Sequence, residues 1–197
     1  MRRAPSDTPD RPTTRDLGPL LRLLGFLRPY LGRLVLAALA LLVAAGSVLA
    51  FGLVIREVVD YVRERSEAII GIHCCGNTDW SMIFDAGPDI VSFDAFAYLD
   101  TFFLYPAELR RFVENGGAIA WGIVPTFGFT GSETLDDLSG RLQEGLSRLQ
   151  AMGLDPTRVS RQSLLTPACG MGTMEPAAAE RVLTLLKGLS ERHRPGR

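Results

Sequence analysis

The chain has 197 residues, of which 47% are hydrophobic and 22% are charged, and its formal net charge is −1. This composition excludes a disordered or collagen-like chain, and three cysteines are too few for a disulfide scaffold. The near-zero charge argues against a nucleic-acid binder. The charge is unevenly divided, because residues 1–65 hold 10 arginines against 6 acids and residues 66–197 hold 11 basic residues against 16 acids. The two parts therefore differ in character.

The first part has the pattern of a membrane segment. Residues 1–16 are polar and rich in Arg, Pro and Thr, which predicts a disordered tail. In residues 17–30 the leucines lie mostly on one side of a helix and Arg22 and Arg28 lie elsewhere, an amphipathic pattern that suits a helix at a membrane interface. Residues 34–55 contain no charge, and as a helix they would measure about 33 Å, enough to cross a hydrocarbon core. We therefore predict a transmembrane helix over 34–55 within a region 17–65.

Two alternatives remain open for the apolar run. A signal peptide would be shorter and nearer the N-terminus, although Ala44-Ala45-Gly46 resembles a cleavage site, and a buried soluble helix would rarely be uncharged for so long. Seven arginines precede the run, whereas the ten residues after it carry three arginines and three acids. The positive-inside rule then places the N-terminus in the cytoplasm and the rest of this single-pass chain across the membrane.

The same segment resembles the start of the transmembrane domain of an ABC exporter. The run Leu24-Gly25-Phe26-Leu27-Arg28-Pro29-Tyr30 is similar to its elbow helix, and Ile55-Arg56-Glu57-Val58-Val59-Asp60 is similar to the end of its first span. The resemblance covers residues 17–62. No Walker A motif, signature loop or further span follows, so we do not expect transport by this chain alone.

The second part, residues 66–197, alternates short apolar runs with helical periodicity. We expect strands at 68–72, 89–93, 118–124 and 163–166, and helices at 79–85, 106–114, 133–152 and 176–191. This alternation predicts an α/β fold with a parallel sheet covered by helices. Four βα units amount to a partial, half TIM-type barrel.

Potential zinc ligands follow the predicted strands. His73, Cys74 and Cys75 come after the first, Asp94 after the second, and Cys169 after the last. Zinc prefers nitrogen, sulfur and carboxylate ligands, and such folds carry chemistry at the carboxyl ends of strands. The alternatives are buried cysteines acting as small hydrophobes and an aspartate that caps a turn. The second histidine, His193, lies in an arginine-rich tail and is expected to be solvated.

Four runs of this part are similar to the C-terminal half of the cobalamin-independent methionine synthase family, whose barrel is shared with uroporphyrinogen decarboxylase and corrinoid-linked methyltransferases. The runs are Ile72-His73-Cys74-Cys75-Gly76-Asn77-Thr78-Asp79-Trp80, Asp89-Ile90-Val91-Ser92-Phe93-Asp94, Trp121-Gly122-Ile123-Val124-Pro125-Thr126 and Leu165-Thr166-Pro167-Ala168-Cys169-Gly170. The resemblance implies zinc held by His73, Cys75, Asp94 and Cys169. It also implies methyl transfer to a small thiol such as homocysteine, from methyltetrahydrofolate or a methylated corrinoid.

The chain departs from that family in three ways. Asp94 stands where Glu is usual, Val124-Pro125 stands where the family has a histidine, and the first half of the barrel is missing. Half a barrel leaves two open strand edges and an uncovered apolar interior, which predicts poor stability or self-association. The predicted topology would also export the thiols to an oxidising side, whereas the enzymes that this part resembles are cytoplasmic. The simplest interpretation is that the chain consists of two unrelated fragments joined near residues 62–66. The other interpretation is a membrane-anchored metal-binding or scaffold protein without catalysis.

Overall fold

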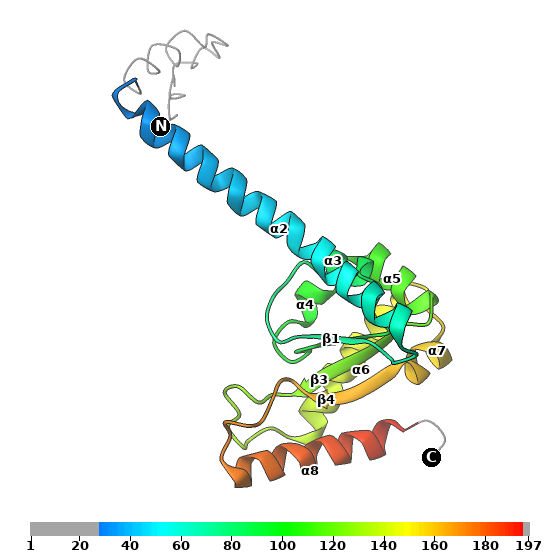
Figure 1. Cartoon of the computed structure of the whole chain (residues 1–197). Coiled ribbons are helices and arrows are strands. Elements are labelled where there is room, and N and C mark those ends of the chain that lie inside the picture. The colour runs from blue at the N-terminus through cyan, green and yellow to red at the C-terminus, as the bar shows by residue number, and fades with distance from the viewer. Residues whose placement is uncertain (1–27, 195–197) are drawn as a thin grey trace, which may run out of the picture. The chain divides into compact units, whose positions relative to one another are not determined.

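The computed structural model describes residues 28–194, which fall into two units that divide between Val48 and Leu49 (Figure 1). The predicted tail 1–16 and most of the predicted amphipathic segment 17–30 lie outside the described residues. The described part begins with a short 3-10 turn, η1 (Arg28–Tyr30), and continues as one long helix, α2 (Leu31–Arg65).

Helix α2 contains the whole of the predicted span 34–55. In the first unit every described side chain is exposed, and large apolar residues such as Leu41 and Val43 are about 70% exposed. Among residues 28–194, α2 belongs to the one helical stretch that is long and apolar enough to cross a membrane, and a signal sequence would share these properties. The prediction of one long apolar helix near the N-terminus is confirmed.

The helix runs ten residues past the predicted span, and these last turns belong to the second unit. Val59 is buried there, and Ile55 packs against the core. The Arg63 guanidinium donates hydrogen bonds to the carbonyl oxygen of Gly87 at 2.9 Å and to Asp89 Oδ1 at 3.1 Å. Helix α2 is therefore unbroken to Arg65, close to the position where the sequence predicts a join between fragments.

The second unit contains a four-stranded parallel sheet in the order β1-β2-β3-β4. Its strands are β1 (Gly71–Cys74), β2 (Ile90–Phe93), β3 (Ala118–Val124) and β4 (Ser163–Pro167). The predicted α/β fold with a parallel sheet is confirmed. The first strand begins three residues later than predicted and ends two residues later. Asp89 Oδ2 accepts a hydrogen bond from the Ile70 N–H at 2.8 Å, so the connection from α2 continues to the residue immediately before Gly71.

The predicted helices are present as α3 (Trp80–Asp85), α5 (Pro106–Glu114), α6 (Leu135–Ala151) and α8 (Pro176–His193). Two short helices, α4 (Leu99–Phe102) and α7 (Pro156–Arg161), were not predicted because neither is long enough to show a periodicity. Helix α7 does carry a local signal, since Asp155 caps it by accepting from the Arg158 N–H at 2.8 Å and Pro156 occupies its first turn.

Aromatic side chains form the centre of the core between the sheet and the helices. Phe93 of β2 stacks on Phe102 of α4 with ring centroids 3.9 Å apart, and it meets Trp80 of α3 and Trp121 of β3 at 5.7 Å. Helix α6 approaches Trp121 closely, and α8 packs against α6 and β4 (Figure 1). Side chains alternate along a strand, so Ser92, the residue before Phe93 in β2, points to the other face of the sheet.

Candidate metal site at the carboxyl end of the sheet

His73 lies near the end of β1 and is oriented by the neighbouring strand. It is in register with Ser92 of β2, and its Nδ1 atom is 2.9 Å from the Ser92 Oγ atom. Residues in register on parallel strands share a face, so the two side chains meet there. Cys75 follows two residues later, just past the end of the strand, and both His73 and Cys75 are exposed.

Cys169 lies on the loop that follows β4, and backbone contacts hold this loop against β3. The Ala168 N–H donates to the Val124 carbonyl at 2.8 Å. Gly122 makes this approach possible, because a Cβ atom there would lie 2.4 Å from the Phe93 oxygen and 2.8 Å from the Ala168 Cα. The Gly122 carbonyl also accepts from the N–H groups of Ala95 and Phe96, so the loop after β2 is held against β3 as well.

The fold brings three of the four predicted ligands together. A ring nitrogen of His73, Cys75 Sγ and Cys169 Sγ all lie within 4.8 Å of one another. The two cysteines come from loops that follow β1 and β4, the two edge strands of the sheet. The loops therefore converge over the carboxyl end of the sheet. His73 and Cys75 are exposed and Cys169 is half-buried, so the cluster faces solution.

The two sulfur atoms interact electrostatically. A hydrogen bond to Cys169, followed by the charge of Cys169 and by burial, raises the pKa of the Cys75 thiol above its usual value. The hydrogen bond favours the neutral thiol of Cys75, and repulsion between two sulfur anions acts in the same direction. A divalent cation bound between the two sulfurs would relieve the repulsion, because metal-bound cysteines are thiolates.

Asp94 does not join this cluster. Its Oδ1 atom accepts a hydrogen bond from the Ala97 N–H at 2.8 Å, and its carbonyl accepts from Tyr98. The carboxylate therefore caps the turn that leads into α4, as in the alternative raised for a strand-ending aspartate. Cys74 also lies outside the cluster, because its Sγ donates to the Gly76 carbonyl at 3.4 Å.

The donor set suits zinc. Zinc bonds of about 2.3 Å to sulfur and about 2.0 Å to nitrogen in a tetrahedron place ligand atoms roughly 3.3–3.8 Å apart. The observed group, within 4.8 Å, needs only a small contraction to reach that spacing. Three protein ligands also leave one tetrahedral position for a water molecule or a substrate, which is typical of catalytic zinc sites.

Sequence reasoning did not identify Ser92 and misjudged His193. The register of β1 and β2 pairs Ser92 with His73, but that register depends on where β1 starts, which the sequence placed too early. His193 was expected to be solvated, and this expectation is wrong. Its ring is partly buried in the second unit, where Nε2 lies 2.7 Å from Ser139 Oγ of α6.

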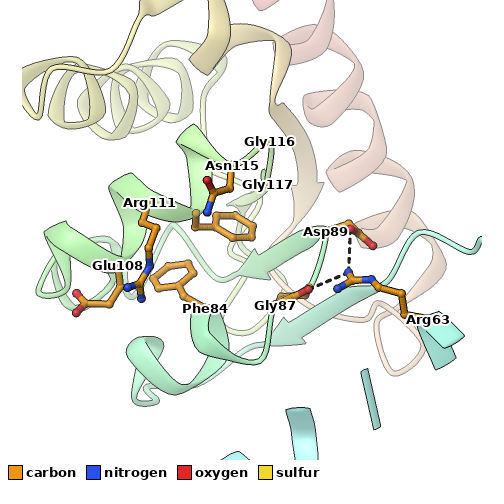
Figure 2. Close-up of a pocket in the computed structure, with 11 residues that line it drawn as sticks. Arg63, Phe84, Gly87, Asp89, Glu108, Arg111, Asn115, Gly116 and Gly117 are labelled. Atoms are coloured by element: carbon orange, nitrogen blue, oxygen red, sulfur yellow. Dashed lines mark hydrogen bonds and ion pairs between the residues drawn. The ribbon is translucent and has the colours of Figure 1, made fainter. Parts of the chain in front are cut away.

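A pocket of about 300 Å³ lies at the opposite, amino-terminal end of the strands (Figure 2). Figure 2 shows Arg63 in this pocket with its guanidinium directed at Asp89 and at the Gly87 carbonyl. Arg111 on its rim pairs with Asp85 at 2.7 Å. Both arginines are thus engaged by the protein itself, and the Arg63 contacts attach the end of α2 to the sheet.

No protein-family model and no curated protein matches this chain. The two resemblances described above therefore rest on the quoted residues alone.

Proposed function

We propose that residues 66–197 are a zinc-dependent methyltransferase of the cobalamin-independent methionine synthase type, present here as half a barrel. The observation that carries the proposal is the meeting of His73, Cys75 and Cys169 within 4.8 Å at the carboxyl ends of parallel strands. This is the end of the sheet where barrel enzymes place their chemistry. The acceptor would be a small thiol such as homocysteine, and the donor methyltetrahydrofolate or a methylated corrinoid.

Three residues of the site would bind the metal, and a fourth, Ser92, orients one of them. His73, Cys75 and Cys169 would hold the metal, and a bound zinc ion would lower the pKa of an incoming thiol so that it reacts as a thiolate at neutral pH. Ser92 fixes the ring of His73 through the 2.9 Å hydrogen bond. The exposure of His73 and Cys75 leaves the cluster open to a small molecule from solution.

The half-barrel is part of the same proposal. Four parallel strands follow one another in chain order and alternate with helices, as in four consecutive units of a TIM barrel. In the described part of the chain, β1 and β4 each have one sheet neighbour, so each leaves one row of backbone groups without a sheet partner. We propose that these edges support self-association, which would supply the missing half.

The test is the zinc content of the full chain, purified in detergent with a reducing agent and measured by mass spectrometry of the metals. We expect stoichiometric zinc in the wild type and a large loss in Cys75→Ser and Cys169→Ser. Cys74→Ser is the matched control, since its thiol lies next to the cluster without belonging to it, and it should retain zinc. Equal zinc in all four proteins, or none in the wild type, would contradict the proposal.

The reaction is tested separately with the zinc-loaded chain. Homocysteine is supplied with methyltetrahydrofolate or methylcobalamin, and methionine is measured by mass spectrometry. Methionine formation that depends on Cys75 and Cys169 supports the methyltransferase. If the chain binds zinc but forms no methionine with either donor, the metal site is supported and the proposed methyltransferase activity is contradicted.

A second candidate is a membrane-anchored fragment of an ABC exporter transmembrane domain with a non-catalytic globular part. The exposed apolar side chains of α2 favour this anchor, with the N-terminus in the cytoplasm. Such a chain should stay in the membrane fraction after alkaline carbonate extraction. Leu41→Arg combined with Leu42→Arg should release it, because charges at the centre of a span are costly. Recovery of the wild type in the soluble fraction would refute the anchor.

A further inference from the structure

The two cysteines of the candidate metal site are also placed for a reaction with each other. Cys75 and Cys169 are 94 positions apart in the chain, yet their sulfur atoms belong to one group within 4.8 Å. They lie on loops that follow opposite edge strands, so a bond between them would join the two edges of the sheet.

We propose that Cys75 and Cys169 form a disulfide when the site holds no metal. The disulfide and the zinc site exclude each other, because both use the same two sulfur atoms. The inference therefore assigns a redox control to the proposed metal site. The disulfide itself requires only the two thiols. The proposal rests on the proposed function only in one respect, namely that bound zinc would protect these thiols from oxidation.

The local backbone gives the loops room to close the remaining distance. Each cysteine is followed by a glycine, Gly76 and Gly170, and a Cβ atom added at either would meet no atom within 4 Å. Disulfide formation needs a sulfur–sulfur distance of about 2 Å, so the loops must approach further. Movement of this kind is easiest in open segments that contain glycine.

Cys74 is the competing partner and is less well placed. Cys74 is the last residue of β1, whereas Cys75 lies just past the strand and belongs with Cys169 to the group within 4.8 Å. The Cys74 thiol is half-buried and donates to the Gly76 carbonyl, whereas Cys75 is exposed. Cys75 is therefore the thiol that meets an external oxidant first.

The oxidant is a low-molecular-weight disulfide such as oxidised glutathione. The Cys75 thiolate attacks one of its sulfur atoms, forms a mixed disulfide and releases one thiol. The Cys169 thiolate then attacks the Cys75 sulfur and releases the second thiol. The protein loses two electrons and two protons, and one small disulfide becomes two small thiols.

The experiment uses the full chain in detergent, stripped of metal by a chelator and equilibrated with mixtures of reduced and oxidised glutathione. Free thiols are trapped with an alkylating agent, and the peptides are identified by mass spectrometry. We expect the wild type and Cys74→Ser to yield a cross-linked pair of peptides containing Cys75 and Cys169. Cys75→Ser and Cys169→Ser should instead keep a mixed disulfide with glutathione.

Zinc added before the oxidant should slow the cross-link about tenfold or more, because metal-bound thiolates are poor partners for exchange. Mixed disulfides alone in the wild type, or a Cys74–Cys75 bond, would overturn the proposal. A cross-link in a chain that binds no zinc would contradict the proposed function and support the disulfide. Zinc binding without a cross-link would support the metal site and contradict the disulfide.

Discussion

Ser92 contacts one of the two ring nitrogens of His73 and so orients the ring. Its Oγ atom lies 2.9 Å from Nδ1, and a metal bound at Nε2 would keep this hydrogen bond. Removing such a partner of a ligand typically costs 10–100-fold in metal affinity. We therefore expect Ser92→Ala to weaken zinc binding by about tenfold or more, measured by competition with a chromophoric chelator.

The control for this prediction is Ser92→Thr, which keeps the hydroxyl group and should restore most of the affinity. The ring tautomer of His73, followed by nitrogen NMR, should shift in Ser92→Ala and not in Ser92→Thr. Unchanged affinity in the alanine variant would show that the hydrogen bond has no part in metal binding.

His193 makes the stability of the second unit depend on pH. Burial of its ring, followed by the charge of Arg192, lowers the pKa of His193 below its usual value of 6.5. The unfolded chain therefore binds this proton more readily than the folded chain, so the free energy of unfolding should fall as the pH drops below about 6.5. Denaturant unfolding of the wild type at several pH values between 5 and 8 measures the slope.

The matched variant is His193→Gln, which can still reach Ser139 but does not titrate. Its unfolding free energy should vary less with pH over the same interval. Identical slopes in the two proteins would show that His193 does not contribute to the pH dependence.

At the scale of the elements, Gly122 lets β3 approach the loop after β4, which carries Cys169. A Cβ atom there would collide with backbone atoms of Phe93 and Ala168, which cannot move independently of their strands. We expect Gly122→Ala to lower the free energy of unfolding by about 1–3 kcal/mol, as overpacking does, and to weaken zinc binding by displacing Cys169. Chemical unfolding followed by tryptophan fluorescence measures the first effect.

A second glycine provides the comparison. Gly140 lies in α6, and a Cβ atom there would meet no atom within 4 Å. Gly140→Ala should raise the free energy of unfolding by about 0.5–1 kcal/mol, because alanine loses less entropy in a helix. If both variants behaved alike, the close contact at Gly122 would not be the cause.

The sequence predicts the bounds of an element well where residues within or next to that element determine them. The bounds of β3, 118–124, agree with the prediction because this buried strand is a continuous apolar run between a Gly-Gly turn and Pro125. The start of β1 was misplaced because it depends on a distant side chain, Asp89, which binds the Ile70 N–H. Such a contact between residues far apart in the sequence has no local signature.

The same distinction explains the site. Residue type and position after a strand were enough to select His73, Cys74, Cys75, Asp94 and Cys169 as candidates, and the structure brings three of them together, namely His73, Cys75 and Cys169. Sequence spacing cannot show where a carboxylate points, and Asp94 is engaged by the Ala97 N–H. Its short side chain can reach the backbone just after it, which is the common role of aspartate after a strand.

At the scale of the whole molecule, the open edges of the sheet predict a dimer. Strand β4 of one copy can pair in parallel with β1 of another, and a twofold axis repeats the pairing to close eight strands. Sedimentation in detergent should then give a dimer. Leu164→Lys should shift it toward the monomer, because Leu164 lies in β4 with 45% of its surface exposed and charge on an edge strand opposes pairing.

Leu183→Lys is the control for this prediction, since Leu183 is also exposed, at 50%, but lies in helix α8 and not in a strand. It should sediment as the wild type does. A wild type that is monomeric at high concentration would contradict the closed eight-stranded assembly.

The convergence of the loops after β1 and β4 also sets an order of events during synthesis. Cys75 leaves the ribosome 94 residues before Cys169. At about 5–20 residues per second, the first thiol waits roughly 5–20 s for its partner. During that interval the nascent chain presents Cys74 and Cys75 without the third sulfur, so mispaired or modified thiols would be acquired before the sheet is complete.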